Sequence, residues 1–317
     1  LYLHAYQVTG KPLYRRIVEE TLEYVRREMT DSSGGFYSAQ DADSEGVEGK
    51  FFIWRPEEIF EVLGKEDGER FNAYYDVTLT GNFEGHSILN VKDHDSEMEL
   101  QLSGARAKLY EAREARVKPD RDEKILTAWN GLMMAAFAEA GAALERQDYT
   151  EVAVANARFL RREVRDGDRL LRTYKDGSAR LKGYLEDYSY LIEGLLALHE
   201  ATFDGEWLQQ ALALGNQMVD LFWAAPSGQF YDTGTDHEQL VLRPRDVQDN
   251  ATPSGSSMAA TVLLKLALVT GDGDLDRRLA QVRLAVFDVD GTLTNGRVTY
   301  VGGDELQTFC VRDGYAL

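Results

Sequence analysis

Apolar positions recur at helical spacing through most of the first 281 residues. Residues 11–29 place Leu13, Ile17 and Val25 on one face, with charged residues between them. Apolar residues three or four positions apart share one side of a helix, so each such segment has a face to bury. Further helices are predicted over residues 127–144, 149–164, 184–202, 206–223, 254–269 and 274–281. The pattern predicts a mainly α protein.

The predicted helices come in pairs, and their connections differ in length. Tight turns within pairs are predicted at residues 147–148, 203–205 and 271–273. Longer stretches between pairs include residues 34–43, 169–174 and 228–233. Trp129, Asp187 and Ser254 each mark the start of the first helix of a pair, a repeat of about 60 residues. Stacked antiparallel pairs put every long connection at one end. We expect the ligand site there, because the free N–H groups and positive dipole ends of the first helices point the same way.

Composition narrows the classes of function. The 317 residues are 44% hydrophobic, enough for a sizeable core, and carry a formal net charge of -19. Such an acidic chain repels nucleic acid and anionic membranes, so a small molecule is the expected partner. The single cysteine, Cys310, excludes an internal disulfide framework and fits a cytoplasmic location. The chain starts at Leu1 inside an amphipathic pattern, without an initiator methionine, and is expected to be a piece of a longer product whose first helix pair is incomplete.

Four sequence blocks, in order, carry a resemblance to a known family. They are GGFYSAQDADSEG at 34–46, KPDRDEKILTAWNGL at 118–132, YLEDY at 184–188 and ATPSGS at 251–256. Residues 1–281 thereby resemble the spermatogenesis-associated, thioredoxin-domain-containing protein family. The resemblance implies an incomplete (α/α) toroid related to sugar 2-epimerases and six-hairpin glycosidases, without the family's amino-terminal thioredoxin-like domain. It implies no defined reaction.

Residues 45–116 differ from the helical repeat and are interpreted as an insertion. Residues 51–54 (FFIW) predict a short strand, and residues 56–63 predict a capped helix. Either a lid over the ligand site or a surface decoration fits this segment.

Acidic and aromatic residues gather on or beside the long connections. The preferred catalytic candidates are Glu186 and Asp187, at the start of a predicted helix, because paired carboxylates can perform glycoside chemistry. The predicted substrate-binding residues are Asp41, Asp43, Trp129, Asn130, Tyr188 and Asp232. The alternative is that the acidic residues cap helices and the aromatic residues seal the core. No cofactor is expected for the toroid.

Histidines support acid–base chemistry less well. Sugar epimerases of this architecture use histidine as acid and base. His199, however, lies on a regular helix among leucines, while His86, His94 and His237 lie in loops without partner spacing. Epimerase activity is therefore an expectation by analogy alone.

A second signal begins at Val282. Residues 284–287 predict a buried strand, after which Asp288 can attack a phosphoryl group, Asp290 can protonate the leaving oxygen and Thr292 can steady the phosphoryl group. Mg²⁺ is needed to offset the repulsion between these carboxylates and the substrate. The supporting blocks are DVDGTLTNG at 288–296, GDELQTF at 303–309 and VRDG at 311–314.

These blocks resemble the start of haloacid-dehalogenase-type phosphatases, most closely 3-deoxy-D-manno-octulosonate 8-phosphate phosphatase. The resemblance implies that Asp288 is the nucleophile and that Asp288, with the backbone of Asp290, holds the Mg²⁺ ion. It also implies a hairpin at residues 297–309 used in oligomer contacts, although Gln307 stands where that family commonly has lysine. Residues 282–317 are too few to close such a domain, so no phosphatase turnover is expected from this chain alone. Two main readings stay open: a truncated toroid that binds or processes a carbohydrate-like ligand, joined to a phosphatase start, or a Mg²⁺-dependent sugar-phosphate phosphatase with a helical partner. A noncatalytic binding scaffold is a third.

Overall fold

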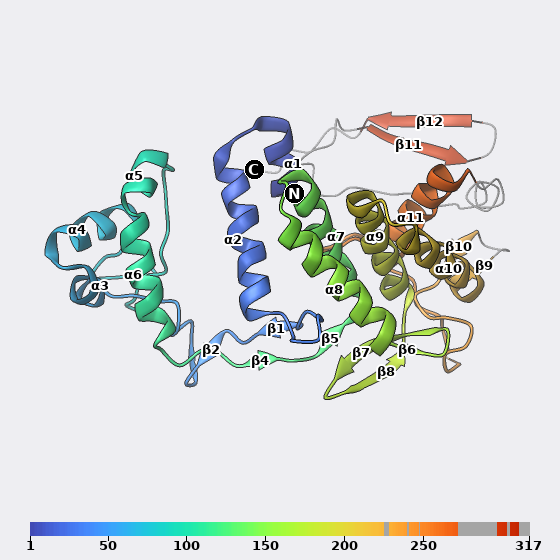
Figure 1. The fold of residues 1–317 in the computed structure, drawn as a ribbon, viewed down its shortest axis with the longest axis horizontal. Helices are drawn as coiled ribbons and strands as arrows, with labels where there is room; N and C mark the ends of the chain where they lie inside the picture. Colours follow the sequence, from blue (N-terminus) through green and yellow to red (C-terminus); the bar gives the residue numbers. More distant parts are fainter. Residues whose placement is uncertain (225–227, 240, 247, 272–296, 303–304, 311–317) are drawn as a thin grey trace. The chain divides into compact units, whose positions relative to one another are not determined.

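The computed structural model describes residues 1–224, 228–239, 241–246, 248–271, 297–302 and 305–310. The chain divides into two compact units, one formed by Leu1–Ser38 with Lys124–Leu317 and the other by Ala39–Glu123. Helices are the main element of both units (Figure 1). The predicted mainly α class is confirmed. In the described part of the chain, no helix combines the length and apolar character needed to cross a lipid bilayer.

The first unit is built from antiparallel helix pairs. Its helices are α1 (Tyr2–Thr9), α2 (Pro12–Glu28), α7 (Thr127–Ala143), α8 (Gln147–Glu163), α9 (Leu185–Thr202), α10 (Gly205–Phe222) and α11 (Gly255–Thr270). Short turns join α1 to α2, α7 to α8 and α9 to α10, and the two members of each pair are in contact. The predicted helices that fall on described residues are confirmed with small shifts at their ends. Helix α8 starts earlier than predicted, and the Arg146 Nε atom lies 2.8 Å from Asp148 Oδ1 across its first turn.

Helices α7 and α9 pack so closely that their backbones touch. A Cβ atom on Gly131 of α7 would lie 2.5 Å from the carbonyl carbon of Tyr190 in α9. A Cβ atom on Gly194 of α9 would lie 2.6 Å from the Gly131 carbonyl oxygen. Both positions therefore require glycine. Because α9 also packs against α11, these three helices lie side by side with α9 in the middle.

Short strands connect the pairs. β5 (Ile125–Leu126), β7 (Arg169–Lys175) and β6 (Arg165–Asp166) pair in the order β5-β7-β6, and β8 (Ser178–Lys182) also pairs with β7. All these pairings are antiparallel, with Leu126 opposite Thr173. β9 (Trp223–Ala224) and β10 (Gln229–Phe230) form a separate two-stranded ladder. The sheet bonds the segment that enters α7 to the connection that leads to α9.

The second unit holds the predicted insertion. Its elements are β1 (Ala39–Gln40), β2 (Asp43–Ser44), β3 (Val47–Glu48), α3 (Pro56–Leu63), α4 (Lys65–Tyr74), α5 (Ser96–Gln101), α6 (Ser103–Glu114) and β4 (Arg121–Asp122). Trp54, Ile59 and Phe71 are among the buried residues of its own apolar core. The predicted helix over residues 56–63 is confirmed as α3.

The predicted strand over residues 51–54 is wrong. These residues form a turn, followed by an isolated bridge between Trp54 and Ser87. The Arg116 Nη1 atom donates to the carbonyl oxygens of Phe51 at 3.2 Å and Ile53 at 2.7 Å. Its guanidinium also lies 4.0 Å from the centroid of the Trp54 ring. The Phe52 and Ile53 amides both donate to the Gly49 carbonyl, at 2.8 and 3.2 Å, so the start of the apolar run is closed by local turn bonds instead of pairing as a strand.

The hairpin expected near the carboxyl end is confirmed in its backbone. β11 (Arg297–Gly302) pairs antiparallel with β12 (Glu305–Cys310), and Arg297 lies opposite Cys310. The phosphatase-motif residues Asp288, Asp290 and Thr292 lie outside the described residues, as does the predicted helix over 274–281. The oligomer role predicted for the hairpin stays a prediction.

Candidate functional site

The amino-terminal ends of α7, α9 and α11 meet at one end of the first unit. The Ala128 amide of α7 donates to Asp187 Oδ1 of α9 at 3.0 Å. At the start of α11, the Cα of Gly255 sits so near α9 that an added Cβ would lie 3.2 Å from the Glu186 nitrogen. The prediction that the long connections and the helix starts share one end is confirmed.

A cavity of about 250 Å³ opens at this end. We call it the mouth cavity, and its lining residues are Tyr184, Glu186, Asp232, Asp246, Asn250, Thr252, Pro253, Ser254 and Gly255. Three carboxylates, an amide and three hydroxyls therefore line a space slightly smaller than the ~300–1,000 Å³ typical of ligand pockets. The mouth cavity suits a small, hydrogen-bonding molecule.

One side of the mouth cavity is the start of α9, where Asp187 is wholly buried. Besides the Ala128 amide, its carboxylate accepts from the Tyr184 amide at 2.8 Å and from Arg172 Nη1 at 3.2 Å. Burial raises the pKa of Asp187 to about 7, against the lowering effects of Arg172 and the two amides. Both oxygens of Asp187 accept hydrogen bonds inside the protein, and the bond from the Ala128 amide connects α9 to α7. This geometry favours the helix-capping alternative for Asp187.

The neighbouring residue, Glu186, faces the mouth cavity instead. Its Oε1 accepts from Arg172 Nη1 at 2.7 Å. The same guanidinium lies 4.6 Å from the centroid of the Tyr184 ring. We call Ala128, Arg172, Tyr184, Glu186 and Asp187 the helix-end cluster. Successive helix residues point about 100° apart, so adjacent carboxylates take different surroundings.

The opposite side is formed by irregular segments, residues 231–239, 241–246 and 248–254, which we call the loop wall. Asp232 and Asp246 both line the cavity from it, and Asp232 Oδ2 accepts from the Asp246 amide at 2.8 Å. Burial, with the carboxylates of Asp246 and Glu186, raises the pKa of Asp232, while the Asp246 amide and Arg245 oppose the rise. Asp232 therefore holds a proton more readily than an ordinary aspartate.

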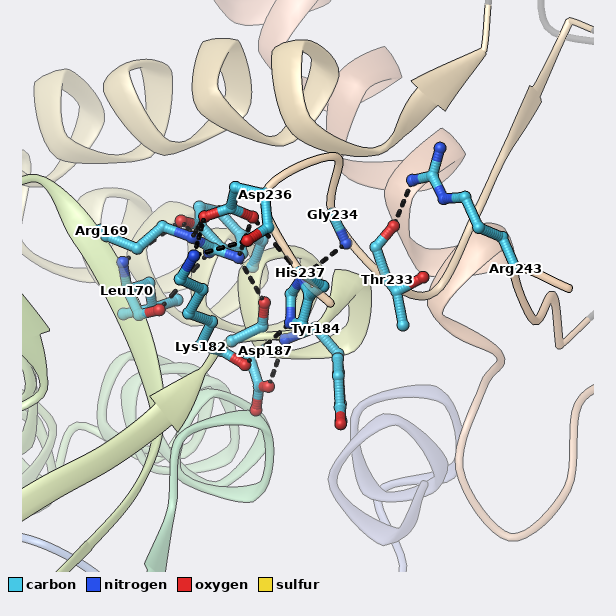
Figure 2. Close-up of polar contacts among 12 residues, drawn as sticks. Arg169, Leu170, Lys182, Tyr184, Asp187, Thr233, Gly234, Asp236, His237 and Arg243 are labelled. Carbon is cyan, nitrogen blue, oxygen red and sulfur yellow. Dashed lines mark hydrogen bonds and ion pairs between the residues drawn. The ribbon is translucent and has the colours of Figure 1, made fainter. Parts of the chain in front are cut away.

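The loop wall is attached to the sheet through Asp236. Figure 2 shows Arg169 and Lys182 directed at this carboxylate, with Arg169 Nε 2.9 Å and Lys182 Nζ 3.2 Å from Asp236 Oδ2. Burial opposes ionisation, but hydrogen bonds and charge from Arg169 and Lys182 lower the pKa of Asp236. The next residue, His237, stacks on Tyr184 with ring centroids 5.2 Å apart. The contacts of Asp236 thus also hold His237 against Tyr184, which lines the mouth cavity.

Two predicted substrate-binding residues are engaged inside the fold. Asn130 is buried, exchanging hydrogen bonds with the Phe36 amide at 2.7 Å and the Phe36 carbonyl at 2.9 Å. The Tyr188 hydroxyl accepts from Arg169 Nη1 at 2.7 Å and from the Leu170 amide at 3.2 Å. Asn130 thus bonds the segment around Phe36 to the start of α7, and Tyr188 bonds strand β7 to the start of α9. Trp129, in contrast, is 49% exposed on the first turn of α7.

The other predicted residues divide between the two units. Asp41 and Asp43 are exposed in the second unit, where the Asp43 amide donates to Asp41 Oδ1 at 3.1 Å. Asp232 lines the mouth cavity as described above. Asp288, Asp290 and Thr292 lie outside the described residues. Within the described ranges, no group of three or more histidine, cysteine, aspartate or glutamate side chains is placed to hold a metal ion.

Sequence reasoning missed two functional candidates. Arg172 lies in a connection that the pattern identified, and its basic side chain beside Glu186-Asp187 was an available signal. Asp246 lies in an irregular segment with no periodicity, so nothing in the pattern marks it. Both reach the site only through the folded chain.

Comparison with known proteins gives sequence relatives over most of the chain. No family model matches. The chain is 33% identical over 329 residues to spermatogenesis-associated protein 20 of Rattus norvegicus, covering 86% of this chain and 41% of that protein. The Homo sapiens protein of the same name is 33% identical over 321 residues, with the same coverage. The chain thus spans about two fifths of the length of these curated relatives. The similarity agrees with the resemblance predicted from the four sequence blocks, and none of the comparisons supports the haloacid-dehalogenase-type resemblance.

Solved structures give weaker likenesses. The match to a D-mannose isomerase covers 86% of this chain and 68% of the isomerase chain, with a TM-score of 0.42 and 11% identity. A cellobiose 2-epimerase from Bacillus thermoamylovorans covers 92% of this chain and 76% of its own, with a TM-score of 0.43 and 12% identity. A family 105 glycoside hydrolase from C. acetobutylicum reaches a TM-score of 0.45 at 10% identity, over 93% of this chain and 77% of its own. Scores at this level do not establish a shared fold or activity.

Proposed function

We propose that the first unit is part of an (α/α) toroid whose mouth cavity binds and processes a small carbohydrate-like molecule. The observation that carries the proposal is the meeting of Glu186 and Asp232 on one cavity, from two different walls. Sugars present many hydroxyls, and the cavity offers carboxylate, amide and hydroxyl partners for them. Because the cavity is acidic, a neutral sugar suits it better than a uronic acid or a sugar phosphate.

The two carboxylates suit acid–base chemistry at a glycosidic bond. Asp232, with its raised pKa, donates its proton to the leaving oxygen. Glu186, beside Arg172, either attacks the sugar carbon or takes a proton from water, depending on the carboxylate separation when substrate binds. Water completes the hydrolysis. None of the five histidines is among the lining residues of the mouth cavity, which favours carboxylate over histidine chemistry.

Trp129 supplies the aromatic surface in this proposal. Of the four tryptophans, Trp54 and Trp207 are buried and Trp223 is half-buried, whereas Trp129 is exposed next to the Ala128–Asp187 contact. An exposed indole face at a helix start is suited to stack against a sugar ring. A longer saccharide would reach it beyond the mouth cavity.

Binding is tested first by fluorescence and thermal unfolding. The purified chain is titrated with D-mannose, cellobiose, D-glucuronic acid and mannitol. A sugar at 100 times its dissociation constant should stabilise the chain by about 2.7 kcal/mol. We expect neutral sugars to stabilise it and cellobiose to change the emission of wild type but not of Trp129→Phe. Stabilisation by none of the sugars would overturn the binding proposal.

Processing is tested separately, by chromatography of the sugars after long incubation. Free glucose from cellobiose that appears with wild type and disappears with Asp232→Asn is the expected result. Asp220→Asn, an exposed aspartate on α10, is the matched control. Binding without any product would leave a noncatalytic sugar-binding scaffold and overturn the catalytic part.

The alternative function is Mg²⁺-dependent hydrolysis of a sugar phosphate at Asp288 and Asp290. The described residues favour it only through the hairpin of β11 and β12, which follows the motif as the resemblance implies. Phosphate release from a sugar phosphate with Mg²⁺, lost in Asp288→Asn and kept in Glu186→Gln, is the result that would establish this alternative.

A further inference from the structure

Arg172 is the hub of the helix-end cluster. It lies on β7, next to Leu171, whose carbonyl oxygen accepts from the Thr127 hydroxyl at 2.6 Å. The backbone that carries Arg172 is thus bonded to the start of α7. From there its guanidinium reaches Glu186 Oε1 and Asp187 Oδ2 at the start of α9. One side chain joins a buried structural carboxylate to a cavity-facing one.

The contact with Glu186 differs from an ordinary surface ion pair. The Arg172 side chain is only 26% exposed and its second partner, Asp187, does not move because both its oxygens are bonded elsewhere. A guanidinium fixed in this way loses little additional entropy when it binds Glu186. Within the described part of the chain, Arg172 is also the only cation recorded in an ion pair with Glu186.

We propose that Arg172 is a positioning residue that holds Glu186 directed into the mouth cavity, using Asp187 as its anchor. The inference rests on the proposed function in naming Glu186 as a reacting carboxylate. It also assigns the two cavity carboxylates to different tasks. Glu186 is paired with a fixed cation, whereas Asp232 on the loop wall accepts a hydrogen bond from the Asp246 amide.

The first test needs no ligand. Carboxyl groups of the folded chain are labelled with a water-soluble carbodiimide and glycine ethyl ester at pH 6, and each site is quantified by mass spectrometry. Arg172→Gln should raise the labelling of Glu186 about fivefold, the factor expected for loss of one partly exposed ion pair. Arg180→Gln, at an exposed arginine on β8, is the matched control and should leave Glu186 unchanged.

Labelling also separates positioning from folding. Asp187 is buried and should stay unlabelled if Arg172→Gln keeps its fold. If that variant unfolds, Arg172→Lys takes its place, because lysine keeps the charge while losing the fork that spans both carboxylates. Glu186 labelling that is unchanged in a folded Arg172 variant would overturn the proposal, whether or not any sugar binds.

The second test is a double-mutant cycle on D-mannose affinity, measured by calorimetry. Arg172→Gln should weaken binding about fivefold in the wild-type background and hardly at all in the Glu186→Gln background. An arginine that acts only by supporting the fold would weaken binding equally in both backgrounds, and that result would overturn the proposal. Failure of D-mannose to bind wild type counts against the proposed function, while the labelling result still decides the role of Arg172.

Discussion

The two sides of the mouth cavity are built in different ways. The helix-end cluster joins β7 to the starts of α7 and α9, two helices whose backbones touch at Gly131 and Gly194. The loop wall has no regular structure at Asp232 or Asp246 and is attached to the sheet by the Asp236 contacts. A helical side and an irregular side thus face one small cavity.

The difference shows how two neighbouring residues acquire different roles. Asp187 points into the rigid contact, loses all exposure and binds two amides and an arginine. Glu186, one residue earlier, faces the cavity, where Asp232 approaches from the loop wall. Substitution of Asp187 should therefore lower mainly the stability of the fold. Substitution of Glu186 or Asp232 should change mainly the binding of ligand.

The largest effect on folding is expected from Asp187→Ala. The change leaves the Ala128 and Tyr184 amides and part of the Arg172 charge without a partner in a buried place. Breaking a buried ion pair from one side costs about 3–5 kcal/mol. Urea unfolding at pH 7 measures the loss, with the exposed Asp220→Ala as the control. A loss below about 1 kcal/mol would contradict the structural role of Asp187.

The close contact between α7 and α9 is tested by Gly131→Ala. The new methyl group would lie 2.5 Å from the Tyr190 carbonyl, so the helices must separate, at a cost of about 1–3 kcal/mol. Gly104→Ala on α6 is the matched control, because nothing lies within 4 Å of its added Cβ. The control should be neutral or slightly stabilising. Equal unfolding midpoints for wild type and Gly131→Ala would show that the contact is not tight.

A smaller loss is expected when the loop wall is released by Asp236→Asn. The lowered pKa of Asp236 means that its stabilisation is present above the unfolded value of about 4 and is lost as the pH falls through the folded pKa. At pH 7 the variant should lose up to about 1 kcal/mol, since the carboxylate is partly exposed. Hydrogen exchange at the Gly234 and His237 amides should speed up more than at the Ala128 amide. Equal acceleration at all three amides would contradict local release.

The smallest effect on stability, with the opposite sign, belongs to Asp232→Asn. Because the folded pKa of Asp232 is raised, its cost to stability appears as the pH rises from about 4 through the folded pKa and persists above it. Asparagine removes this cost, and its side-chain oxygen can still accept from the Asp246 amide. Unfolding curves at pH 4 and pH 7 should show a gain of no more than about 1 kcal/mol, at pH 7 only. A loss at pH 7 would mean that Asp232 is ionised and paired in the folded chain.

Sequence patterns predicted the helices of the first unit because apolar spacing determines which face of a helix is buried. They also predicted the end of the first unit at which the long connections and the candidate site lie, since short turns and long connections alternate. They did not separate Glu186 from Asp187. Helix α9 buries residues on almost every side, from Leu185 to Leu198, so no polar face reveals which carboxylate points outwards.

Tertiary contacts explain the remaining differences. The apolar residues 51–54 were predicted as a strand, but Arg116, more than 60 positions later, gathers their carbonyls into a turn. Asn130 and Tyr188 were chosen for their polar groups, which connect the chain to itself through Phe36 and Arg169. Long-range partners of this kind leave no periodic trace in a single sequence.

In the proposed function, Glu186, and not the rest of α9, recognises the ligand. Calorimetric titration of D-mannose into wild type, Glu186→Gln and Glu200→Gln tests this role, because Glu200 is an exposed glutamate on the same helix that does not line the mouth cavity. We predict unchanged affinity in Glu200→Gln and a loss of about tenfold or more in Glu186→Gln, the value of a hydrogen bond to a charged group. Equal affinities in all three proteins would contradict the claim.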